Sequence, residues 1–123
     1  MSEQSIRLNY QRAIVQADKL TEIGRSIKYM ADRDYEDAIN GISSAWKGEN
    51  ANTYISKARA LQGKIKATGQ SLINTADEMR RKAQIIRDAE LDALRIAQER
   101  EALGKTVAAI KKSTIGNKKT RFF

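Results

Sequence analysis

The sequence contains no cysteine, no proline and no histidine. Without cysteine there is no disulfide framework and no thiolate metal site, and without histidine the commonest general base and metal ligand is missing. Aromatic residues make up 6% of the chain and charged residues 31%. A charged, proline-free composition favours long helices over a β-sandwich or an α/β enzyme. We therefore expect a non-enzymatic all-α protein of one domain, with no cofactor and no metal.

Long hydrophobic runs are also absent. Residues 1–25 contain no continuous apolar run of signal-peptide length. No stretch of the chain approaches the roughly 18 apolar residues that a membrane-spanning helix needs. We therefore expect that, if the protein leaves the cell, it does so without a conventional leader peptide.

The positive charge is concentrated at one end of the chain. All 15 acidic residues precede residue 105, together with 17 of the 23 Lys and Arg, so that residues 1–104 are nearly neutral. The remaining six cations account for +6 of the net charge of +8: Lys105, Lys111, Lys112, Lys118, Lys119 and Arg121. We interpret residues 105–123 as a basic, partly disordered tail. A solvated end is the simplest explanation, and a nucleic-acid or membrane contact is the alternative.

Two helical patterns fill most of the chain. Residues 1–9 alternate around Ile6 and Leu8, which predicts an extended segment, with Asn9 as the N-cap of a helix. From Tyr10 to about Ile42, apolar or small residues recur three or four apart, as in one face of a helix: Ala13, Ala17, Leu20, Gly24, Ile27, Ala31, Tyr35 and Ala38. A heptad pattern follows, with Tyr54, Ala58, Leu61, Ile65, Thr68, Leu72, Thr75, Met79, Ile86 and Ala93.

The two patterns are separated only by Ser43 to about Asn50, which contains Trp46-Lys47-Gly48. A connection this short predicts an antiparallel helical hairpin over residues 10–104. Gly48 can adopt the backbone angles of the reversal, and Glu49 or Asn50 can cap the second helix. The single Trp can bury roughly 200 Å² at the corner.

The apolar stripes are too wide for one hairpin to bury, and contiguous apolar patches usually mark a partner surface. Two hairpins packed face to face form a four-helix bundle, which removes this exposure. We therefore expect dimerisation, without a choice between an identical and a different partner. The expected interface residues are Leu20, Ile27, Tyr54, Leu61, Ile65, Leu72, Met79 and Ile86.

Trp46 and Gly48 at the midpoint between two long helices, followed by Ala51 and Tyr54, resemble the Trp-X-Gly family of small proteins exported by type VII (Esx) secretion systems. The resemblance covers approximately residues 5–100. It implies a homodimeric or heterodimeric four-helix bundle that is made in the bacterial cytoplasm and is secreted or displayed at the cell surface. It also implies partners of the same family or larger helical toxins, and contact with a secretion ATPase.

In this family, the Trp-x-Gly turn of one protomer lies near a Tyr-x-x-x-Asp/Glu segment of the other. No tyrosine follows Tyr54 here, and the nearest match is Ile86-x-x-x-Glu90. The resemblance therefore implies that this chain is exported together with a partner that carries the missing signal, or that it needs no export.

Three other functions remain as alternatives. The same helical patterns suit a cytosolic scaffold or chaperone-like protein that is not exported. The basic tail suits nucleic-acid binding, although the body lacks a basic stripe interleaved with aromatic residues. The second helix suits a membrane surface less well, because its polar face mixes charges of both signs. The acidic run Asp32 to Asp37 is most simply a solvated helix face, with metal binding as the alternative. We expect no small-molecule substrate.

Overall fold

The structure is a computed structural model that describes residues 1–121, with side chains described for residues 1–115. All described residues are helical except Met1, Ser2 and the three residues Trp46 to Gly48. The prediction of an all-α protein is therefore confirmed. The elements in chain order are α1 (Glu3–Met30), the π-helical segment η1 (Ala31–Tyr35), α2 (Glu36–Ala45) and α3 (Glu49–Arg121).

The chain becomes helical almost at its first residue. The Ser5 amide donates to Ser2 Oγ at 3.1 Å, and the Ser5 hydroxyl donates to the Ser2 carbonyl oxygen at 3.1 Å. Ser2 therefore satisfies an amide of the first turn that would otherwise lack a partner, as an N-cap does. An ion pair of Arg7 with Glu3 supports the same turn. The prediction of an extended segment over residues 1–9, with Asn9 as the N-cap, was wrong for this reason.

The chain reverses over three residues. The Trp46 amide closes α2 by donating to the Ile42 carbonyl at 2.9 Å, and Trp46 itself is extended, with φ −121° and ψ 119°. Gly48 has φ +116°, a conformation that strains any residue with a Cβ. The Asn52 amide then donates to the Gly48 carbonyl at 3.0 Å as α3 begins. Glu49 and Asn50 already lie inside α3, so neither is the predicted cap.

The chain forms two compact units. The hairpin unit is Tyr10–Gln84, and the terminal unit joins Met1–Asn9 to Ile85–Phe123. The division differs from the predicted hairpin domain over 10–104, because the chain is helical from Glu3 and its first nine residues pack with the segment that begins at Ile85. In the terminal unit Ile6 is buried, and it lines a small cavity of about 360 Å³ with Met1, Glu90 and Leu94 among its neighbours.

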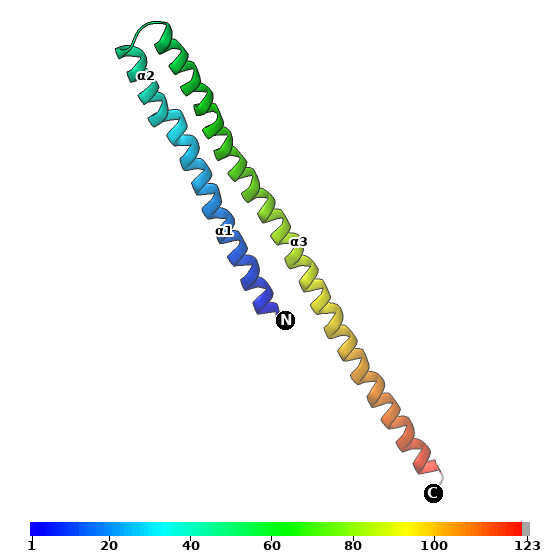
Figure 1. Cartoon of the computed structure of the whole chain (residues 1–123). Helices are drawn as coiled ribbons and strands as arrows, with labels where there is room; N and C mark the ends of the chain where they lie inside the picture. Colours follow the sequence, from blue (N-terminus) through cyan, green and yellow to red (C-terminus); the bar gives the residue numbers. More distant parts are fainter. Residues whose placement is uncertain (122–123) are drawn as a thin grey trace. The chain divides into compact units, whose positions relative to one another are not determined.

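In the hairpin unit, the first arm (α1, η1 and α2) and α3 run antiparallel from the loop, side by side (Figure 1). Small side chains line the contact between the arms, a set we call the small-residue seam. The seam consists of Ala17, Thr21, Gly24 and Ala31 on the first arm and Ala51, Gly69 and Ala76 on α3, all buried.

The arms approach most closely at two glycines of the seam. A Cβ on Gly24 would lie 2.6 Å from the Gly69 carbonyl oxygen and 2.8 Å from Ile73 Cγ1. A Cβ on Gly69 would lie 2.7 Å from the Gly24 carbonyl oxygen. Each backbone therefore occupies the space that a side chain of its partner would need, and only glycine fits at this crossing.

The basic end of the chain is helical, contrary to the prediction of a partly disordered tail, because α3 continues to Arg121. All described side chains from Arg95 to Ile115 are exposed. Phe122 and Phe123, the last two residues of the predicted tail, lie outside the described residues.

Candidate functional site

Polar bonds connect the two arms of the hairpin along its length. They run from near the loop to the far end of the unit: Arg59 Nη1 to Glu36 Oε2 (2.9 Å), Lys66 Nζ to Asp32 Oδ1 (3.0 Å), Lys28 Nζ to Gln70 Oε1 (2.7 Å) and Arg80 Nη2 to Asp18 Oδ1 (2.8 Å). Most of these side chains are exposed, so each bond contributes little stability by itself. Together they fix which residues of the two arms lie opposite each other.

A cluster of such bonds surrounds the π-helical segment. Gln62 Nε2 donates to the Ala31 carbonyl oxygen at 2.9 Å and to Glu36 Oε2 at 2.7 Å. A π-helical turn interrupts the regular i→i−4 ladder, and Gln62 supplies a donor to a carbonyl within that turn. The bonds from Gln62 and then Arg59 lower the pKa of Glu36 below its ordinary value of 4.5.

A second cluster lies toward the other end of the hairpin unit. The Arg80 guanidinium donates to Asp18 Oδ1, to Asp77 Oδ1 at 2.8 Å and to Thr21 Oγ1 at 2.7 Å. The bond to Asp18 is the main cause that raises the pKa of Arg80 above its ordinary value. The buried Thr21 hydroxyl also donates to the Ala17 carbonyl, so this polar atom of the seam is fully satisfied.

All the residues of these cross-arm bonds lie on one side of the seam. An α-helix turns by about 100° per residue, which places Lys66, Gln70 and Arg80 roughly 20–100° to one side of Gly69. By the same rule, Asp18 and Lys28 lie about 40–120° to one side of Gly24. Since these two sides are bonded to each other, they form one face of the hairpin, which we call the polar face.

The expected interface residues lie on the opposite side of the seam, whereas Ile55 and Ile73 fall about 40° from Gly69 on the side of the polar face. Leu61, Leu72 and Met79 fall roughly 60–80° from Gly69 in the direction away from the polar face. Ile23 and Ile27 fall about 60–100° from Gly24, also away from it. Because the polar sides of the two arms meet, these apolar sides share the other face of the hairpin. This apolar face consists of Leu20, Ile23, Ile27 and Met30 on α1 and Tyr54, Leu61, Ile65, Leu72 and Met79 on α3.

The expected interface residues of the hairpin unit all lie on this apolar face, and they differ in burial. Tyr54 is 65% exposed, and Leu61 is also exposed. Leu20, Ile27, Ile65, Leu72 and Met79 are half-buried against the seam. Ile23 and Met30, which widen the predicted helical stripe but were not among the expected interface residues, are exposed on the same face. Their spacing of three or four from Ile27 was the available signal.

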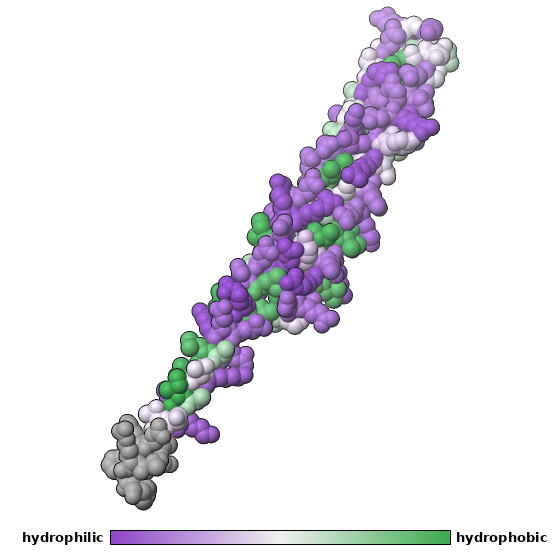
Figure 2. All heavy atoms as spheres, turned by 180° about the vertical axis from the view of Figure 1, so that it is seen from behind, coloured by the Kyte–Doolittle hydropathy of each residue, from purple (hydrophilic) through white to green (hydrophobic). Residues whose placement is uncertain are grey.

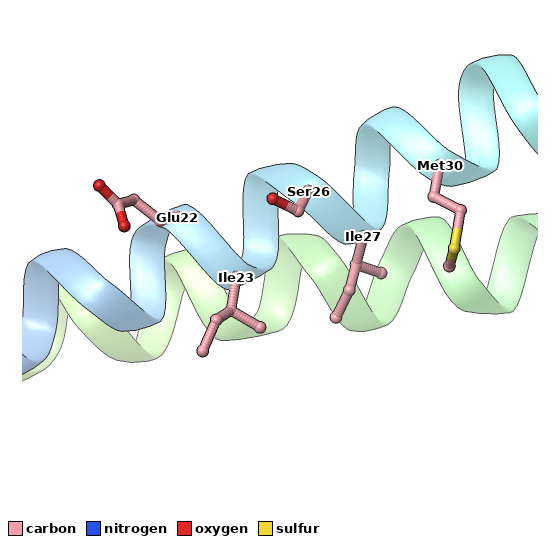
Figure 3. Close-up of a pocket in the computed structure, with 5 residues that line it drawn as sticks. All are labelled: Glu22, Ile23, Ser26, Ile27 and Met30. Atoms are coloured by element: carbon pink, nitrogen blue, oxygen red, sulfur yellow. The ribbon is translucent and has the colours of Figure 1, made fainter.

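Ile23, Ile27 and Met30 form an open groove on α1. Together with Glu22 and Ser26, they line a volume of about 350 Å³. Figure 3 shows the three apolar side chains on one side of the α1 ribbon, whereas Glu22 points away from them. Hydrophobic atoms gather in patches along the hairpin in Figure 2, with hydrophilic atoms between them.

The loop presents two aromatic rings. The ring centroids of Trp46 and Tyr54 are 5.7 Å apart, and the ring planes are tilted by 52°. Trp46 remains 44% exposed, so the prediction that it fills the corner as a buried anchor was only partly right. The indole packs against the Tyr54 ring, which is itself mostly exposed, so this contact covers only part of the indole. The indole and Tyr54 therefore add an exposed aromatic pair to the tip of the hairpin.

Ile86 and Glu90 lie in the terminal unit, on consecutive turns of α3. Ile86 is 56% exposed, and Glu90 is half-buried beside the cavity that Ile6 lines. An aliphatic side chain cannot donate the hydrogen bond that a tyrosine hydroxyl would donate at the same position.

Two of the four acidic residues in the run Asp32 to Asp37 bond to the other arm. Asp32 binds Lys66 and Glu36 binds Arg59. Among residues whose side chains are described, no group of three or more acidic residues is placed to hold a metal ion. Of the described helices, none is long and apolar enough to cross a membrane. Comparison of the chain with family models, curated proteins and solved structures gave no match.

Proposed function

We propose that this chain is a partner-binding protein of the Trp-X-Gly type, which acts by protein–protein contact in a type VII secretion system. The observation that carries the proposal is the apolar face of the hairpin. The two arms pack through small residues and bond through the polar face, which leaves large aliphatic side chains beside the seam only partly covered. A second helical hairpin seated on this face would complete a four-helix bundle.

The composition of the two faces supports a helical protein as the partner. A contact that buries Leu61, Leu72 and Met79 needs a matching apolar surface, and an antiparallel pair of helices offers one of the right length. The partner is either a second copy of this chain or another helical protein, such as a family member or a larger effector. No enzymatic role is proposed, because binding is the only chemistry that the residues of this face offer.

The loop supports a role in export. Trp46 is the largest side chain of the protein, yet 44% of it is exposed at the loop. Gly48 holds the reversal in a conformation that few other residues tolerate. A large exposed ring on a rigid turn is a suitable recognition element for a secretion ATPase or a co-exported partner.

The export role is tested with Trp46→Ala, and Tyr29→Ala serves as the matched control because Tyr29 is an exposed aromatic residue away from the loop. Export into the culture medium should be lost with Trp46→Ala and retained with Tyr29→Ala. Circular dichroism should show that both variants keep the helical content of the wild type. Unchanged export of folded Trp46→Ala would remove Trp46 from the export signal.

A non-exported scaffold or chaperone-like protein is the second candidate. It is favoured by Ile86, whose exposed aliphatic side chain stands where the family has a tyrosine and cannot donate a hydrogen bond. Fractionation of intact cells separates the two candidates. Complete retention of the protein inside the cells, with the secretion system active, supports the scaffold and contradicts export.

A further inference from the structure

We propose that the end of α3, from Leu103 to Arg121, binds the surface of an anionic lipid bilayer. This segment is not part of the hairpin unit, and the inference is independent of the proposed function. The apolar face of the hairpin and the Trp46 loop play no part in it.

The first observation is an exposed aliphatic stripe. Leu103, Val107 and Ile110 follow one another at steps of four and three, so they lie along one side of the helix. Their exposed fractions are 64%, 42% and 60%. In Figure 2, hydrophobic atoms stand out on the part of the molecule that leads to the grey residues. No described residue covers this stripe, which therefore remains in contact with water.

The second observation is the charge of the same segment. The last acidic residue of the chain is Glu101, and six cations follow it. Lys105 forms an exposed ion pair with Glu101 at 3.4 Å, a contact that contributes little. Lys111 and Lys112 form no ion pair within the described residues. The segment thus offers a concentrated positive charge that the rest of its helix does not neutralise.

The two features lie on different sides of the helix. At about 100° per residue, Lys105 and Lys112 fall roughly 140–160° from Val107, and Lys111 falls about 40° from it, at the edge of the stripe. An interfacial helix has this arrangement, because it places its aliphatic side among the acyl chains while lysines extend toward the headgroups. The sequence then adds Lys118, Lys119 and Arg121, followed by Phe122 and Phe123.

An anionic membrane explains both features, whereas nucleic acid explains only one. Binding to a phosphate backbone uses the cations and would leave Leu103, Val107 and Ile110 in water. A bilayer of anionic lipids attracts the cations, by about fivefold in affinity for each one near the surface, and also buries the stripe. Earlier parts of α3 mix acidic and basic residues, as Asp88, Glu90 and Arg95 illustrate, and therefore lack this property.

The test is flotation of the full chain with lipid vesicles. Vesicles of phosphatidylcholine alone are compared with vesicles that also contain phosphatidylglycerol. The bound fraction should correspond to an affinity at least about tenfold higher for the anionic vesicles, and it should fall near 1 M salt, where the Debye length is about 3 Å. Equal binding to both vesicles, or none to either, overturns the proposal.

Three variants distinguish the contribution of the aliphatic stripe to vesicle affinity from the contribution of the lysines. One carries Leu103→Gln, Val107→Gln and Ile110→Gln, and a second carries Lys105→Gln, Lys111→Gln and Lys112→Gln. The matched control carries Lys19→Gln, Lys57→Gln and Lys64→Gln, which remove three exposed lysines of the hairpin. We expect the first two variants to lose at least about tenfold in vesicle affinity, and the control to stay near the wild type.

Two outcomes would contradict the inference. If the stripe variant, with helical content intact by circular dichroism, bound anionic vesicles as tightly as the wild type, the contact would be ionic only. If a DNA or RNA duplex bound the wild type and the stripe variant equally, and more tightly than anionic vesicles did, the segment would be a nucleic-acid contact instead.

Discussion

At the scale of single residues, the hairpin depends on side chains that are small or absent. Gly24 and Gly69 let the two backbones come so close that neither has room for a Cβ. Glycine otherwise costs a helix about 1 kcal/mol relative to alanine. Its presence at both positions of one crossing indicates that the close approach outweighs this cost.

Gly24→Ala should destabilise the protein by about 1–3 kcal/mol, because the added methyl group overlaps the Gly69 carbonyl and Ile73. The matched control is Gly63→Ala, since a Cβ at Gly63 meets nothing within 4 Å. Gly63→Ala should stabilise the protein by about 0.5–1 kcal/mol through helix propensity alone. Urea unfolding followed by circular dichroism measures both changes, and a stabilising Gly24→Ala would mean that the arms do not cross closely there.

Glu36 makes the stability of the hairpin depend on pH in the acidic range. The bonds from Gln62 and Arg59 lower its pKa below 4.5, so the folded protein binds this proton less tightly than the unfolded chain does. The stabilisation is therefore complete above pH 4.5 and is lost as the pH falls through the folded-state pKa. Thermal unfolding should show that Glu36→Gln costs stability at pH 7 and costs progressively less below pH 4.5.

Asp37→Asn is the control for this pH effect, because Asp37 neighbours Glu36 but has no described bond to the other arm. Its unfolding temperature should differ from that of the wild type by a similar amount at both pH values. A Glu36→Gln variant whose deficit did not shrink in acid would show that the Glu36 carboxylate is not held by the other arm.

At the scale of the elements, the residues of the heptad pattern and the residues that contact the first arm form two different stripes on α3. The heptad residues Tyr54, Leu61 and Leu72 share one surface of α3, which flanks the seam, and its role as an interface stays a prediction. The first-arm side of the seam, with Ala17, Gly24 and Ala31, belongs to the stripe that the sequence predicts. The α3 side could not be predicted, because Ala51, Gly69 and Ala76 carry little hydrophobic signal. Likewise, no local signal marks the π-helical turn, which Gln62 stabilises from a distant part of the sequence.

Gln62→Ala tests the role of this side chain at η1. The substitution removes the donor to the Ala31 carbonyl and to the Glu36 carboxylate, and losing these part-buried bonds, one of them to a charged group, should cost about 1–3 kcal/mol. Gln70→Ala removes an exposed cross-arm bond to Lys28 and should cost less than about 1 kcal/mol. Urea unfolding of both variants gives the comparison. An equal decrease in the free energy of unfolding for both variants would show that the bond to η1 stabilises the protein no more than an exposed bond does.

At the scale of the whole molecule, the hairpin has a polar face whose side chains bond the two arms together and an apolar face that is only partly buried, which we propose as the surface for a partner. The length and composition of the chain sufficed to predict an all-α protein, and the break at Trp46 to Gly48 marked the reversal. The helical start at Ser2 and the helical end of α3 were missed. The helical start depends on the side-chain cap that Ser2 supplies. The end of α3 is a charged helix that no other described element covers.

The most direct test of the central claim is the molar mass of the purified chain by sedimentation equilibrium, with Leu61→Glu and Ala67→Glu as variants. Both sites are exposed, but only Leu61 lies on the apolar face. We predict that the wild type and Ala67→Glu associate above the single-chain mass of 13.8 kDa, and that Leu61→Glu shifts the equilibrium toward one chain. A wild type that remains a single, cooperatively unfolding copy at every concentration would contradict the claim that a second copy of this chain covers this face.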